Sequence, residues 1–191
     1  MIDDIVRAFI SLFVIMNPFA SIPIFLAVAK EKDVNKATTQ AVSVAAAVLF
    51  TFLFFGPLVL AAFGITLNSL KVAGGLVLGI LGIQLVLGQK LFEKDKKYPP
   101  ALTLIGTPML TGPGVITMTM ILTKEYGYIV TTCAAVASLT LSWLVLRASG
   151  FIERAVGGNV IDIVSRVMGL LVTATAVELV VGGITAMLKG V

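Results

Sequence analysis

The sequence contains no histidine and a single cysteine, Cys133, among its 191 residues. Imidazole proton relays and histidine-ligated metal sites are therefore excluded, as are an internal disulfide and a cysteine metal cluster. Charged residues make up only 13% of the chain, and no pair of acids lies deep in an apolar run. Because these are the usual parts of hydrolytic and metal-dependent enzymes, we expect no enzyme, no metal site and no soluble cofactor.

Apolar residues are abundant instead, at 58% of the chain, which is well above the share in a soluble domain. A spanning helix needs about 20 apolar residues. Transmembrane barrels show alternating strands of about ten residues, whereas these runs are continuous, so the predicted fold class is all-α and polytopic. The first run lacks a basic start and a cleavage site, and we expect it to stay in the mature protein. The predicted spans lie near residues 4–30, 38–63, 70–89, 101–123, 127–147 and 165–188.

Lysine and arginine are distributed unevenly between the two sides of these helices. Ten lie in the connections between the first and second, third and fourth, and fifth and sixth spans. Four lie on the other side: Arg7, Lys71, Lys124 and Lys189. Because positive residues gather in short cytoplasmic loops, we expect a multi-pass plasma-membrane protein with both termini outside. The net charge of +4 follows from this asymmetry and gives no reason to expect a nucleic-acid partner.

The lysine-rich segment 90–100 divides one membrane domain, 1–191, into two blocks of similar plan, 1–89 and 101–191. Each block contains three predicted spans. An odd number of spans makes the second block enter the membrane from the opposite side, which predicts inverted repeats related by a pseudo-twofold axis. An offset of 95 positions relates Lys71, Gly74 and Gly88 to Arg166, Gly169 and Gly183.

Proline interrupts the first apolar run of each block. The breaks extend from Asn17 to Pro23 and from Thr107 to Gly114, and each contains two prolines five residues apart. Proline cannot donate a backbone N–H and disfavours helix in the preceding residue. We therefore expect the first and fourth helices to be discontinuous, with Pro23 and Pro113 starting the second half-helices.

Unwound backbone persists in hydrocarbon only when it is buried in protein or lines a wet cavity, so the two breaks are expected to meet. Half-helix N-termini present free N–H groups that suit a carboxylate, while carbonyls and polar side chains can receive an ammonium group or a cation. The alternative is that the prolines merely kink two packed helices. The predicted substrate-binding residues are Asn17, Pro18, Ser21, Pro23, Thr107, Pro108, Thr111, Gly112, Pro113 and Gly114.

Glu178 is the only acid deep in a predicted span. An ionisable group at such depth is expensive and usually faces the bundle interior or water, which makes Glu178 the candidate carrier of a coupling proton. Gln84 lies 94 residues earlier and is its candidate counterpart in the first repeat. A structural carboxyl and a packing amide are the alternatives, and sodium is the alternative coupling ion.

The two breaks also resemble the motifs of a known family. The Asn-Pro-x-x-x-x-Pro segment from Asn17 to Pro23 and the Gly-Thr-Pro-Met-Leu-Thr-Gly-Pro-Gly segment from Gly106 to Gly114 are similar to paired segments of the MarC-related six-span membrane proteins. The resemblance covers nearly the whole chain. It implies a secondary transporter that moves small neutral amino acids, glycine or alanine, by alternating access. An ion or solute channel and a non-transporting accessory protein are the alternatives. A homo-oligomer is compatible with all of these functions.

Overall fold

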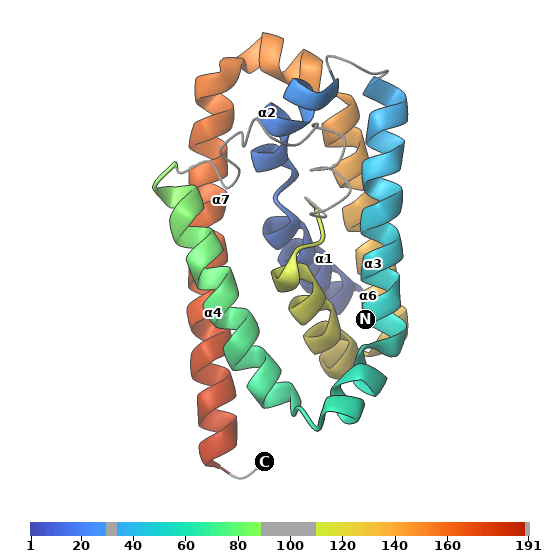
Figure 1. Ribbon diagram of the computed structural model, residues 1–191, viewed down its shortest axis with the longest axis vertical. Coiled ribbons are helices and arrows are strands. Elements are labelled where there is room, and N and C mark those ends of the chain that lie inside the picture. Colours follow the sequence, from blue (N-terminus) through green and yellow to red (C-terminus); the bar gives the residue numbers. More distant parts are fainter. Residues whose placement is uncertain (30–33, 89–109, 190–191) are drawn as a thin grey trace.

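The structure is a computed structural model that describes residues 1–29, 34–88 and 110–189. These residues form helices, and no strand occurs among them, which confirms the all-helical class. Figure 1 shows how the helices pack. In chain order they are α1 (Ile2–Met16), α2 (Pro18–Ala29), α3 (Val34–Phe63), α4 (Leu67–Val86), α6 (Pro113–Arg147) and α7 (Ser149–Leu188).

Within the described ranges, five helical segments are long and apolar enough to cross a membrane. They are Ile2–Pro23, Val34–Phe63, Leu67–Val86, Pro113–Arg147 and Ser149–Leu188. The predicted count of six differs because α6 takes up both the end of the fourth predicted span and the whole of the fifth. Residues 101–109 of the fourth span lie outside the described residues. The chain is thus a helical membrane protein with five candidate spans, and six spans stay a prediction.

α6 consists of two legs that meet at Gly127, whose backbone is not helical (φ 83°, ψ 170°). Leu110 and Leu146 lie at opposite ends of this part of the chain, yet both belong to one buried cluster with Met16. The chain therefore folds back at Gly127, and the second leg runs behind α3 (Figure 1). The first leg, of 14 residues, rises only about 21 Å. It is too short to span a hydrocarbon core of about 30 Å without the residues that precede it.

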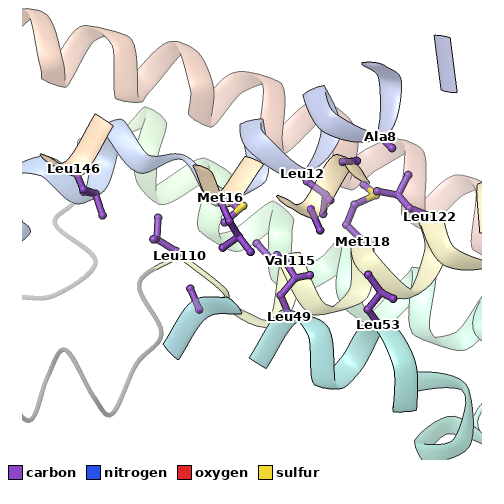
Figure 2. Packing of buried hydrophobic residues seen from close by; sticks show 14 of the residues in the cluster. Ala8, Leu12, Met16, Leu49, Leu53, Leu110, Val115, Met118, Leu122 and Leu146 are labelled. Atoms are coloured by element: carbon purple, nitrogen blue, oxygen red, sulfur yellow. The ribbon is translucent and has the colours of Figure 1, made fainter. Parts of the chain in front are cut away.

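The core lies between α1, α3 and both legs of α6. α1 contributes Ala8, Leu12 and Met16, which recur every fourth residue and so form one buried stripe. Figure 2 shows this stripe against buried side chains of α3 and of the first leg of α6. The second leg is joined to α1 by the Ser138 hydroxyl, which donates to the Phe9 carbonyl at 3.3 Å.

α4 and α7 pack closely along each other (Figure 1), and small residues set the distance between them. A Cβ atom on Gly75 would lie 2.9 Å from the Ala176 carbonyl oxygen. A Cβ atom on Gly82 would lie 2.9 Å from the Gly169 carbonyl oxygen. Such separations are shorter than real side chains allow, so these glycines are what permits the two backbones to approach.

Candidate functional site

The first break lies at Asn17, between α1 and α2. The backbone there is left-handed (φ 38°, ψ 64°), and its N–H donates to the Phe13 carbonyl at 3.0 Å, which closes α1. The side-chain Oδ1 accepts a hydrogen bond from the Ala20 N–H at 3.3 Å and so caps α2. Asparagine suits both tasks, because its short polar side chain tolerates the left-handed region and caps helix N-termini well.

α2 begins at Pro18, so the prediction that Pro23 starts the second half-helix is wrong. Proline is favoured at the first helical position because the N–H it lacks would have no partner there. Pro23 lies inside α2 with an exposed side chain, whereas Ser21 is buried. The first break is therefore a single residue, which is shorter than the spacing of the prolines indicated.

The second break precedes α6, and here the prediction is confirmed, because α6 begins at Pro113. Gly112 has extended backbone (φ −70°, ψ 178°), and its carbonyl accepts hydrogen bonds from the N–H groups three and four residues later, at 3.0 and 3.2 Å. The Pro113 side chain is exposed. Thr107 and Pro108, which were also predicted to belong to this break, lie outside the described residues.

The two breaks come together inside the molecule. Gly114, in the first turn of α6, packs between α4 and α1, because an added Cβ would overlap the Leu78 side chain and lie 3.4 Å from Ile15 Cγ2. Met16 directly precedes the first break, Leu110 is the first described residue of the second, and both belong to one buried cluster (Figure 2). The described residues of the predicted site thus lie at the junction of α1 with α2, on α2, and at the start of α6. Asn17, Ser21 and Thr111 are buried there, whereas Pro23 and Pro113 are exposed.

Two polar atoms at this point are buried and have no hydrogen-bond partner in the part of the chain that the structure describes: Asn17 Nδ2 and Thr111 Oγ1. The two residues are 5% and 0% exposed. Nearly all buried polar groups are paired, and leaving one unpaired costs about 1–3 kcal/mol. We call these two atoms the orphan pair. An amide N–H can only donate and a hydroxyl can donate or accept, so the orphan pair suits a small polar ligand.

Sequence reasoning missed two further residues of this kind, Ser142 in α6 and Ser149 at the start of α7. Both are fully buried, and neither hydroxyl has a partner within residues 1–29, 34–88 and 110–189. The only sequence signal was a serine in an apolar run. Ser138 carries the same signal and has an ordinary partner, so the pattern does not separate the two cases.

Glu178 lies in α7 but away from both breaks. It is two residues from the buried Ala176 and therefore about 200° around the helix axis from it. Its side chain is exposed in the single chain, so of the two expected surroundings, bundle interior or water, it does not have the first. The role of proton carrier is not tested by this placement.

Gln84 lies on α4 and is half-buried. Like Glu178, it belongs to the α4–α7 pair and not to the breaks. Among the residues that the structure describes, no group of three or more His, Cys, Asp or Glu side chains could hold a metal ion. The site is therefore composed of amides, hydroxyls and backbone groups, which bind by hydrogen bonds and helix-end dipoles.

The family model described as "MarC family integral membrane protein" matches residues 2–188. A UPF0056 membrane protein of Methanocaldococcus jannaschii is 33% identical over 94% of this chain and 95% of its own. Another of Aquifex aeolicus is 33% identical over 96% and 94%, and YhcE of Escherichia coli is 28% identical over 96% and 93%. No solved structure matches the chain. With its helical membrane architecture and paired breaks, the chain belongs to the MarC family of integral membrane proteins.

Proposed function

We propose that this protein is a secondary transporter of small neutral amino acids, with glycine and alanine as substrates, that works by alternating access. The observation that carries the proposal is the orphan pair, Asn17 Nδ2 and Thr111 Oγ1, which lies at two helix breaks in the core. Both atoms are without a partner among the described residues, and a ligand that supplies partners to such atoms stabilises the protein.

The chemistry of the breaks fits a zwitterion. The N-termini of α2 and α6 carry partial positive charge, which favours a carboxylate, and the Asn17 amide adds a donor beside α2. The C-terminal end of α1 carries partial negative charge and favours the ammonium group. The C-terminal end of α1 and the N-terminal end of α2 meet at Asn17. A short amino acid can therefore contact both helix ends at once.

The α4–α7 contacts support inverted repeats. Gly75 contacts Ala176, and Gly82 contacts Gly169. Gly75 lies 94 positions before Gly169, and Gly82 lies 94 positions before Ala176. A shift of 94 residues therefore turns each contact into the other. A pseudo-twofold axis that exchanges α4 with α7 produces this pattern, and transporters with inverted repeats place substrate sites at the repeat interface.

The orientation belongs to the same proposal. α3 begins and α6 ends at one end of the molecule, while α7 ends at the other (Figure 1). The ten lysines and arginines that the sequence places on one side of the spans include Lys36, Arg147 and Arg154 at the first end. The four on the other side are Arg7, Lys71, Lys124 and Lys189. By the positive-inside rule, the first end faces the cytoplasm of the cell and both termini face outward.

The test is uptake of radiolabelled glycine and alanine into liposomes that contain the purified protein, with an inward proton gradient, an inward sodium gradient or neither. Saturable uptake that one gradient accelerates is the expected result. Large unitary currents would indicate a channel instead. A folded protein that moves neither amino acid under all three conditions would contradict the transporter proposal and favour an accessory role.

Thr111→Val tests the orphan pair. Valine keeps the shape of threonine but removes a hydroxyl that has no partner in the described structure. We expect the substrate-free protein to become more stable by about 1 kcal/mol, because a desolvated group is gone. Uptake should fall roughly tenfold in kcat/KM, because the same group is lost to the substrate. Thermal unfolding in detergent and uptake kinetics measure the two effects.

The matched control is Thr119→Val in the same leg of α6. Thr119 is equally buried, but its hydroxyl already donates to the Val115 carbonyl at 2.7 Å. This variant should transport as the wild type does and gain no stability. Equal behaviour of the two variants would mean that Thr111 is an ordinary packing residue.

Glu178→Gln tests proton coupling, which we retain in the proposal because this is the sole acid within the apolar run 167–188. The amide keeps the size of the carboxyl but cannot exchange a proton. We expect proton-driven accumulation to disappear, while exchange of internal for external glycine continues. Unchanged accumulation in the Glu178→Gln protein would exclude this residue as the proton carrier and direct attention to sodium.

A further inference from the structure

Ser142 is fully buried in the second leg of α6, and its hydroxyl has no hydrogen-bond partner among the described residues. Hydroxyls in helix interiors usually donate to the carbonyl four residues earlier. Thr131 and Thr140 of the same leg do so, at 2.9 and 2.7 Å. Ser142 departs from this habit at a fully desolvated position, where an unpaired group is expensive.

The position of Ser142 relative to α1 follows from its neighbours along the second leg of α6. One turn earlier, Ser138 donates to the Phe9 carbonyl of α1. One turn later, Leu146 belongs to the buried cluster with Met16 and Leu110 (Figure 2). α1 and the second leg run in the same direction, so Ser142 lies level with the last turn of α1, just before the first break.

The groups beside Ser142, at the last turn of α1, differ in charge from those on the α2 side of the first break. The last turn of α1 presents carbonyl groups that have no partner within the helix and carries partial negative charge. A cationic group is favoured there, and a serine hydroxyl can accept a hydrogen bond from it. The Asn17 amide and the N-terminus of α2 lie on the other side of the break, where a donor and partial positive charge favour an anionic group.

We propose that Ser142 is a third substrate contact, whose hydroxyl accepts a hydrogen bond from the ammonium group of the bound amino acid. The inference rests on the proposed function and deepens it, because it assigns the two ends of the substrate to the two sides of the break. Ser149, the other buried serine without a partner in the described ranges, is excluded from the contact. It lies at the start of α7, where a Cβ added to the next residue, Gly150, would lie 4.0 Å from Leu26 Cδ2 of α2, so this end of α7 packs beside α2 and not beside the last turn of α1.

The first experiment compares Ser142→Ala with Ser138→Ala. Ser142→Ala should raise the KM for glycine about tenfold, as expected for one hydrogen bond to a charged group, without lowering the unfolding temperature of the substrate-free protein. Ser138→Ala loses a hydrogen bond that the protein itself makes, so it should unfold at a lower temperature with an unchanged KM. A wild-type KM in Ser142→Ala, in a preparation whose wild type transports, would overturn the inference and leave the proposed function standing.

The second experiment tests, without relying on transport, whether position 142 is accessible to a small reagent and is covered by bound glycine. Cys133, the only cysteine, is replaced by serine, and Ser142→Cys or Ser138→Cys is added to that background. A small water-soluble methanethiosulfonate should modify Cys at 142 and not at 138, and glycine should slow the modification. No modification at 142, or modification that glycine leaves unchanged while the wild type binds glycine, would overturn the contact. A wild type that neither binds nor transports glycine would overturn the proposed function together with it.

Discussion

Asn17→Gly is expected to lower uptake, measured as kcat/KM, by tenfold or more while the protein still folds. Glycine adopts the left-handed backbone of this position without strain. Loss of the side-chain cap on α2 costs only a few tenths of a kcal/mol when glycine is the replacement. Loss of the amide removes a donor to a charged substrate, which is worth about 1.5–3 kcal/mol. Uptake kinetics and thermal unfolding of the same preparation separate the two effects.

Asn17→Ala is the matched variant, because it lacks the amide as the glycine variant does but must pay for the left-handed backbone. That backbone costs a residue with a Cβ roughly 1–2 kcal/mol. The alanine protein should therefore unfold at a lower temperature than the glycine protein, with uptake equally impaired in both. Normal uptake in Asn17→Gly would show that the residue acts through its backbone only, and that the orphan amide binds nothing.

Gly82→Ala is expected to destabilise the protein by about 1–3 kcal/mol, the usual cost of overpacking a core. The added Cβ would overlap the Thr173 hydroxyl and lie 2.8 Å from the Thr173 backbone nitrogen. α7 backbone cannot move aside as a flexible side chain can, so α4 and α7 must separate. A fall in unfolding temperature of about 2–4 °C for each kcal/mol is the measurement.

Gly79→Ala provides the control on the same helix. A Cβ at Gly79 would lie 3.7 Å from the Ala176 Cβ, which is ordinary contact. Alanine is also the better helix former by about 1 kcal/mol. The Gly79→Ala protein should be as stable as the wild type or more stable. If both variants were stabilised equally, the close approach of α4 and α7 at Gly82 would be contradicted.

The predictions from sequence succeeded where a local cause was sufficient. Long apolar runs require helices in a bilayer, whatever the rest of the chain does. Proline breaks a helix through its own ring and its missing N–H, so the interruptions near Asn17 and before Pro113 were predictable from single residues. The start of α2 was misplaced because a proline is tolerated in the first turns of a helix and does not say which of two prolines begins it.

Which side chains of a helix are buried and which are exposed was not predictable in the same way. α7 is apolar nearly all round, and such a helix carries no periodic signal for its buried face. The exposed position of Glu178, opposite Ala176, therefore depends on which side of α7 packs on α4. The same holds for Ser138 and Ser142, which are alike in sequence and differ in whether a carbonyl from α1 lies within reach.

The apolar runs and the prolines were enough to predict a helical membrane protein with a break at Asn17 and a helix that starts at Pro113, because each of these signals acts within a few residues. Only the packing of the helices showed that the two breaks meet, that the chain folds back at Gly127, and which buried polar atoms have no partner among the described residues. Burial and hydrogen-bond pairing depend on segments far apart in the chain. The residues that define the proposed site were therefore visible only once α1, α2 and α6 were packed together.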